Sequence, residues 1–272
     1  MTLYLGNKAV CPTKIVTKEV VKEVVKEVAK NKFGASVDTW IGDVDANGAL
    51  NRTTWTGALN FEGVKEIGNN GLYYAFYDNT GITSVGLSSL QTVDTTGLDN
   101  AFYNCTGITN VDLSSLQTVG AYGLRYAFYN CTGITNVDLS SLQSIDTGGL
   151  NYAFGSCSGI TSVDLSSVRS VDMYGLYRAF YYCTGITSVN LSSLQSAGTY
   201  GLQYAFYNCK KLTTISFPSL TSVKLDSFIS AFGACTALTE IHFRGDMQAT
   251  IEAMSDYSSK WGATNATIYF DL

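Results

Sequence analysis

Charge, proline and histidine are all scarce in this chain. Charged residues make up 14% of its 272 residues, and it contains two prolines and one histidine. Ordinary domains carry roughly 25% charged residues, so few side chains are available for ion pairs or acid–base chemistry. No run of about 18 apolar residues occurs, so no membrane span is predicted. Residues 1–10 lack a charged segment followed by a long apolar one, which predicts no secretory signal peptide.

The motifs of common catalytic sites are also missing. There is no phosphate-binding G-x-x-x-x-G-K loop, no G-x-G-x-x-G after a predicted strand and no G-x-S-x-G turn. No C-x-x-C pair or Cys/His cluster suits zinc. The one histidine, His242, falls at an outward strand position and has no nucleophile paired with it. We therefore expect no enzymatic activity and no cofactor, and a surface position for His242.

What the chain does have is a unit of 26 residues that repeats without insertion or deletion. The alanine of its A-F-x-x-C segment recurs at seven positions: Ala75, Ala101, Ala127, Ala153, Ala179, Ala205 and Ala231. A fixed period of 20–50 residues is typical of a solenoid, in which each unit buries its apolar face against its neighbours.

Residues 108–131 represent one unit. Ile108, Val111 and Leu113 alternate with polar residues, which predicts a half-buried strand. After a turn, the spacing of Leu124, Ala127, Phe128 and Cys131 predicts one apolar stripe on a short helix of about two turns. The predicted α/β fold therefore has a parallel sheet on its concave side and short helices on its convex side, with eight or nine strands in all.

The A-F-x-x-C segment followed by I-x-x-V-x-L resembles the BspA-type (Treponema-type) leucine-rich repeat. The resemblance covers about residues 56–245, and it implies a leucine-rich-repeat solenoid used for adhesion and surface recognition. Two features depart from the family pattern: the period is about three residues longer than usual, and proline, common after the strand in the family, appears there only at Pro218. One unit has Asn79 where the others have cysteine. Six units carry the cysteine, and we expect these residues to form a buried ladder of free thiols: Cys105, Cys131, Cys157, Cys183, Cys209 and Cys235.

The predicted organisation has five parts. These are an N-terminal tail (1–12), a helical or coiled-coil segment (13–32), an N-terminal cap (33–58), the solenoid (59–245) and a C-terminal cap (246–272). The Lys/Glu/Val pattern of residues 13–32 fits either a short coiled coil that forms a homotrimer or a lone surface helix. With this segment, the N-terminal head resembles bacteriophage or prophage tail attachment proteins.

One segment within the predicted N-terminal cap is a candidate calcium-binding loop. Asp43, Asp45 and Asn47, followed by Gly48, resemble the opening of an EF-hand loop, but Thr54 stands where the loop needs glutamate. A simple Asn-Gly turn is the alternative reading.

Two sets of repeated polar residues are candidates for ligand binding. The first is a ladder on the outward face of the strands, for which a repeatedly copied solvated carboxylate is the alternative: Asn110, Asp112, Asn136, Asp138, Asp164 and Asn190. The second is an aromatic row on the other side of each unit, which could also be structural packing: Tyr126, Tyr152 and Tyr204. Tyrosine offers a rigid apolar face with a polar tip, which suits sugars and proteins.

The charge of the repeats excludes one class of partner. Residues 66–209 contain three arginines and no lysine against nine acidic residues, which is a net charge of −6. Nucleic acids need clustered cations, so nucleic acid is not expected to bind the solenoid. The sequence favours a binding module for a cell-surface protein or glycan, on a virion or cell surface by resemblance. The alternative, favoured by the missing signal peptide, is a cytoplasmic scaffold for protein partners.

Overall fold

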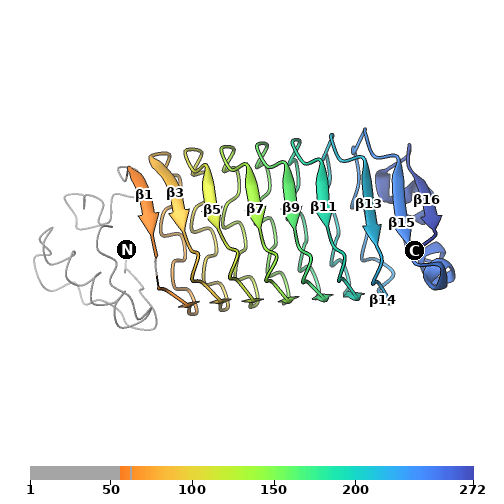
Figure 1. Ribbon diagram of the computed structural model, residues 1–272, viewed down its shortest axis with the longest axis horizontal. Helices are drawn as coiled ribbons and strands as arrows, with labels where there is room; N and C mark the ends of the chain where they lie inside the picture. The colour runs from red at the N-terminus through yellow and green to blue at the C-terminus, as the bar shows by residue number, and fades with distance from the viewer. Residues whose placement is uncertain (1–55, 62) are drawn as a thin grey trace, which may run out of the picture.

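The chain forms a solenoid that advances by one turn every 26 residues (Figure 1). The computed structural model describes residues 56–61 and 63–272. The predicted coiled coil at 13–32, its homotrimer, almost all of the 33–58 cap, and the calcium candidates Asp43, Asp45 and Asn47 lie outside the described residues.

Within the described residues, nine parallel strands line one face, and we call them the main row. Their register moves by one repeat per strand, so Val163 lies opposite Val137 on one side and Val189 on the other. Ladder hydrogen bonds join them in three groups, β1-β3-β5, β7-β9-β11 and β13-β15-β16. Their bounds are β1 Gly57–Asn60, β3 Ile82–Gly86, β5 Asn110–Asp112, β7 Asn136–Asp138, β9 Ser162–Asp164, β11 Ser188–Asn190, β13 Thr214–Phe217, β15 Glu240–Phe243 and β16 Thr267–Phe270.

A second parallel sheet, which we call the short row, follows where the sequence indicated a turn. Each of its seven strands has two residues, of which the second points inward in most turns, as Val119 and Ile145 do. The bounds are β2 Glu66–Ile67, β4 Thr92–Val93, β6 Thr118–Val119, β8 Ser144–Ile145, β10 Ser170–Val171, β12 Ser196–Ala197 and β14 Ser222–Val223.

The prediction of a short helix in every repeat is wrong. Between each short strand and the next main strand, the chain forms consecutive tight turns, and we call this the turn side. Its residues enter the left-handed region every four positions, as at Tyr122, Tyr126 and Asn130, where φ is 55°, 53° and 58°. Left-handed backbone is incompatible with a continuous right-handed α-helix.

Hydrogen bonding explains why the turns are stable. The amide of Ala127 donates to the carbonyl of Leu124 within its own turn at 3.0 Å, whereas the amide of Phe128 donates to Ala153 of the next repeat at 2.8 Å. In an α-helix every amide after the first turn bonds within the helix, but here every second amide bonds to a neighbouring repeat. These additional bonds between repeats offset the roughly 1–2 kcal/mol cost of a left-handed residue.

Apolar residues pair between the two rows and the turn side to form one continuous core. Phenylalanine rings stack from repeat to repeat along it, with Phe102 and Phe128 at 5.2 Å and 5°. The six repeat cysteines are buried free thiols, and each thiol donates to a phenylalanine carbonyl of the preceding repeat, as Cys157 does to Phe128 at 3.0 Å. In the first described repeat, buried Asn79 replaces the cysteine, and its side chain accepts from the amide of Gly81 at 2.9 Å.

The C-terminal end is closed by a small helical segment and a last strand. It contains the 3-10 helices η1 (Gly245–Met247) and η2 (Tyr257–Gly262), the α-helix α2 (Gln248–Glu252), and β16 beside β15. Trp261 is fully buried here against Phe228, Phe232 and Phe243. Its ring covers the end of the phenylalanine stack, which would otherwise face water.

Candidate functional site

A shallow depression of about 330 Å³ lies on the main row, over the central strand group β7-β9-β11. We call it the sheet groove. It brings together four of the six ladder residues that the sequence singled out, whereas Asn110 and Asp112 lie one strand away on β5. Its lining residues are Asn136, Asp138, Ser162, Val163, Asp164, Ser188, Val189 and Asn190.

Four residues of the ladder also stabilise turns, which the sequence analysis did not predict. Each ends a main strand and accepts a hydrogen bond from the amide two residues later, which is an Asx-turn. The acceptor is one carboxylate or amide oxygen, Oδ1, in every case. The bonds are Ser114 N to Asp112 at 3.1 Å, Ser140 N to Asp138 at 3.0 Å, Ser166 N to Asp164 at 2.9 Å and Ser192 N to Asn190 at 3.1 Å.

The charge of this ladder is not neutralised by the protein. None of Asp112, Asp138 and Asp164 forms an ion pair within the described part of the chain, where the ion pairs involve Arg125, His242 and Arg244. The second oxygen of each carboxylate makes no hydrogen bond to any described residue. The groove thus presents half-exposed anionic oxygens with amide and hydroxyl groups between them, and no aromatic ring lines it.

The tyrosine candidates lie together on the turn side. The rings of Tyr126 and Tyr152 stack at 4.6 Å, while Tyr204 lies two repeats beyond Tyr152. Arg178 occupies the same column between Tyr152 and Tyr204, and its guanidinium carbon lies 5.2 Å and 4.6 Å from their ring centres. Burial, and then the neighbouring Tyr152, raise the pKa of Tyr126 to about 12, so its phenol stays neutral.

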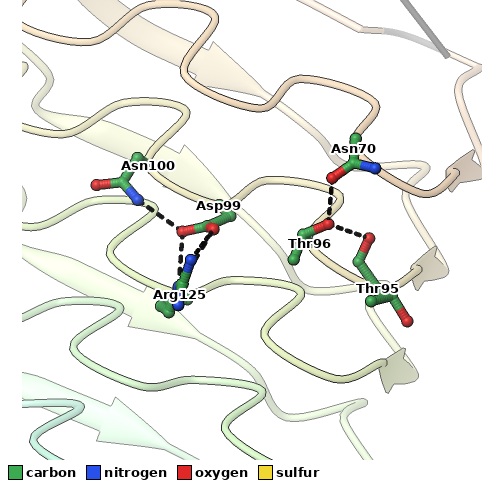
Figure 2. Close-up of polar contacts among 6 residues, drawn as sticks. All are labelled: Asn70, Thr95, Thr96, Asp99, Asn100 and Arg125. Atoms are coloured by element: carbon green, nitrogen blue, oxygen red, sulfur yellow. Dashed lines mark hydrogen bonds and ion pairs between the residues drawn. The ribbon is translucent and has the colours of Figure 1, made fainter.

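The sequence analysis overlooked two arginines on the turn side. Asp99 is fully buried and accepts three hydrogen bonds from Arg125 of the next repeat, the shortest at 2.6 Å, and a fourth from Asn100, also at 2.6 Å (Figure 2). The signal was present, since Asp99 and Arg125 occupy the same column one repeat apart. Arg178 likewise interrupts a column of tyrosines.

The remaining reactive side chains show little catalytic character. Burial raises the pKa of the Cys105 and Cys235 thiols to about 12, which disfavours the nucleophilic thiolate. His242 is half-buried, stacks on Tyr269 at 4.8 Å, and its Nδ1 lies 2.9 Å from a carboxylate oxygen of Asp271. Among the described residues, no three His, Cys, Asp or Glu side chains gather as a metal site would require, and no helix has the length and apolarity to cross a membrane.

A comparison with known protein families identifies the family of this chain. The family model "BspA type Leucine rich repeat region (6 copies)" matches residues 65–201, 100–229 and 151–259, which together exceed half of the chain. The chain therefore belongs to the BspA-type leucine-rich repeat family. Solenoids of this class are typically non-enzymatic binding domains that use their extended surfaces.

Solved structures include similar solenoids at low sequence identity. Internalin C2 from Listeria monocytogenes is 21% identical, with 78% of this chain and 79% of that chain covered and a TM-score of 0.38. The TLR13–ssRNA13 complex is 10% identical, with 85% of this chain and 39% of that chain covered and a TM-score of 0.37. A comparison with curated proteins gives no match.

Proposed function

We propose that this chain is a non-enzymatic adhesion module that recognises a cell-surface protein or glycan through the sheet groove. The observation that carries the proposal is the pair Asp138 and Asp164, whose charge no described residue neutralises, inside a depression of about 330 Å³. Like charges on neighbouring strands repel each other, so a cationic or hydroxyl-rich ligand relieves a cost that the free protein carries.

The chemical groups of the groove limit the kinds of ligand that can bind there. Carboxylate, amide and hydroxyl groups offer many hydrogen bonds but no ring on which a sugar could stack. Lysine or arginine side chains of a protein, amino groups of a glycan and rows of sugar hydroxyls all satisfy these groups. Anionic polymers do not satisfy them, because the charged groups of this groove are carboxylates.

The test is the binding of labelled full-length protein to whole bacterial cells, before and after surface polysaccharide is removed. The variant D138N/D164N keeps the turn-forming oxygens and removes two charges from the groove. D146N/D172N is its charge-matched control, because both aspartates are exposed residues that directly follow short strands. Saturable binding that D138N/D164N weakens and the control keeps supports the proposal.

Two outcomes of the same test contradict it. If D138N/D164N binds cells as well as D146N/D172N does, the sheet groove is not the binding site. Binding to no cell type, with recovery of protein partners from inside a cell, supports the scaffold alternative instead. Loss of binding after polysaccharide removal identifies a glycan, and retained binding that protease treatment of the cells abolishes identifies a protein.

A narrower form of the proposal is a phage or prophage tail attachment protein that trimerises through residues 13–32. Its support is the Lys/Glu/Val pattern of that segment, which lies outside the described residues. Deletion of residues 1–32 is expected to convert a trimer into a monomer, as measured by light scattering. An unchanged mass after the deletion contradicts the trimer and leaves the adhesion proposal standing.

A further inference from the structure

Arg178 carries a positive charge that the protein leaves unneutralised. It forms no ion pair among the described residues, in contrast to Arg125, which is bound to the buried carboxylate of Asp99. Burial lowers the pKa of Arg178, but the hydrogen bond and the electrostatic attraction from Tyr152 outweigh this effect and raise it. The guanidinium is therefore a permanent cation on a half-buried side chain.

Four tyrosine rings hold this cation in place. Its central carbon lies 5.2 Å from the ring centre of Tyr152, 5.1 Å from Tyr177, 5.2 Å from Tyr181 and 4.6 Å from Tyr204. Each distance is within the range of a cation–π contact. A guanidinium fixed in this way loses little side-chain freedom when a ligand binds.

The hydrogen-bonding capacity of Arg178 is largely unused. Nη1 donates to the hydroxyl of Tyr152, and this is its one hydrogen bond to a described residue. Nε is buried without a partner among the described residues and lies out of reach of a ligand, whereas Nη2 is not buried and makes no hydrogen bond to a described residue. A guanidinium has five N–H donors in a planar fork that matches a carboxylate, so the cluster has donors available for an acidic group.

An exposed aromatic ring adjoins one of the four rings around the cation. The ring of Tyr182 is 43% exposed and lies 4.5 Å from that of Tyr181, one of the four rings around Arg178. The column that Tyr182 occupies carries small polar residues in most other repeats, such as Asn130 and Ser156. An exposed ring beside a fixed cation suits a sugar ring that bears a carboxylate.

We propose that the Arg178 cluster binds the carboxylate of a uronic acid within an acidic polysaccharide, with Tyr182 stacking on the sugar. The ligand is a sugar rather than a nucleic acid, because the site has one cation within acidic repeats whereas phosphate chains need several. It is a sugar rather than an acidic peptide, because the exposed ring beside the cation would have no defined role with an aspartate or glutamate side chain. This site shares no residue with the sheet groove and goes beyond the function proposed for that groove.

The test measures binding of the full-length protein to polygalacturonate and to alginate by biolayer interferometry. The informative variant is R178Y, because it restores the tyrosine that Tyr126, Tyr152 and Tyr204 supply in the same column and the same left-handed conformation. R169Q is the matched control: it also removes one positive charge, and glutamine is the residue at this column in four other repeats. R178K keeps the charge but removes the planar fork, and it serves as the second variant if R178Y fails to fold.

The expected result is saturable binding by the wild type and by R169Q, with at least about tenfold weaker binding by R178Y and R178K. Methyl esterification of polygalacturonate, which removes its carboxylates, is expected to abolish binding. The proposal is overturned if neither polymer binds, if R178Y binds as the wild type does, or if poly-glutamate binds as tightly as the polysaccharides. The groove variant D138N/D164N is expected to bind polygalacturonate normally, which separates the two sites.

Discussion

The carboxylate of Asp138 accepts a hydrogen bond from the backbone amide of Ser140 at 3.0 Å. Two repeats later, the neutral amide of Asn190 accepts the equivalent bond from Ser192 at 3.1 Å. The turns after β5, β7, β9 and β11 therefore use an oxygen acceptor, which need not carry a charge. It follows that the fold does not explain why aspartate stands at three of these four positions.

This separation of oxygen from charge predicts a difference between two triple variants. D112N/D138N/D164N is expected to change the free energy of unfolding by less than about 0.5 kcal/mol per site. The triple alanine variant loses the acceptor as well and is expected to cost about 1 kcal/mol per site. Urea unfolding followed by circular dichroism measures both.

One result of this comparison would contradict the prediction. If the asparagine variant is destabilised as much as the alanine variant, the carboxylate charge itself supports the turn. In that case the aspartates need no ligand to explain them, and the proposed groove loses its main support.

The pair of Asp99 and Arg125 leads to a second prediction. The side chain of Asp99 is fully buried and that of Arg125 is 36% exposed. R125Q leaves the buried carboxylate without its partner and is expected to destabilise the protein by about 3 kcal/mol. The double variant D99N/R125Q has neutral residues of similar shape, as Asn151 and Gln203 are in the same column, and is expected to recover most of this loss.

Urea midpoints of the two single variants and the double variant complete this mutant cycle. An additive cycle, in which the double variant is as unstable as the two single variants together, contradicts the pairing. The variant R244Q is a suitable control, because the carboxylate that Arg244 contacts, Asp246, is exposed. It is expected to cost less than about 1 kcal/mol.

Only part of the fold could be predicted from the sequence. Alternation along residues such as Val111 and Leu113 establishes the main strands, since an inward side chain every second residue has one explanation. The turn side was read as a helix because inward pairs repeating every four residues, such as Ala127–Phe128 and then Cys131, cannot be distinguished from a 3.6-residue period over eight residues. The left-handed residues and the hydrogen bonds between repeats distinguish the two structures.

The candidate sites, too, could be predicted only in part from the sequence. The outward position of Asp138 was predictable from its strand, but its bond to Ser140 depends on how the strand turns. The surroundings of Arg178 combine three neighbouring repeats, so no single unit reveals them. Two signals were available: Arg178 interrupts a column of tyrosines, and Asp99 and Arg125 occupy one column a repeat apart.

The cysteine ladder yields a prediction about chemical reactivity. Burial raises the pKa of all six thiols, and that of Cys105 and Cys235 to about 12. In a C11S variant, which leaves only these six, a maleimide reagent at pH 8 is expected to react at least about 100-fold more slowly with the native protein than with the unfolded protein. Rapid labelling of the native protein, located by mass spectrometry, contradicts the buried ladder.

His242 connects the last strand to the rest of the solenoid in a pH-dependent way. Burial lowers its pKa, but hydrogen bonds to Asp271 and Glu240 outweigh this effect, so the net pKa is raised above its ordinary value of 6.5. Besides these two carboxylates, it faces the ring of Tyr269 on β16. Asp271 follows β16 directly, so the protonated imidazole attaches the end of the chain to β15.

The sign of the effect follows from the raised pKa. Protonated His242 is favoured in the folded state, so its contribution to stability is complete below about pH 6.5 and is lost as the pH rises through the higher folded value. Urea unfolding at pH 5.5 and pH 8 is expected to show a stability advantage of the wild type over H242Q that is larger at pH 5.5. Subtracting the variant removes the contribution of the titrating groups that do not contact His242. A difference between wild type and H242Q that is constant, or that grows with pH, shows that Asp271 and Glu240 do not bind the imidazolium as the structure indicates.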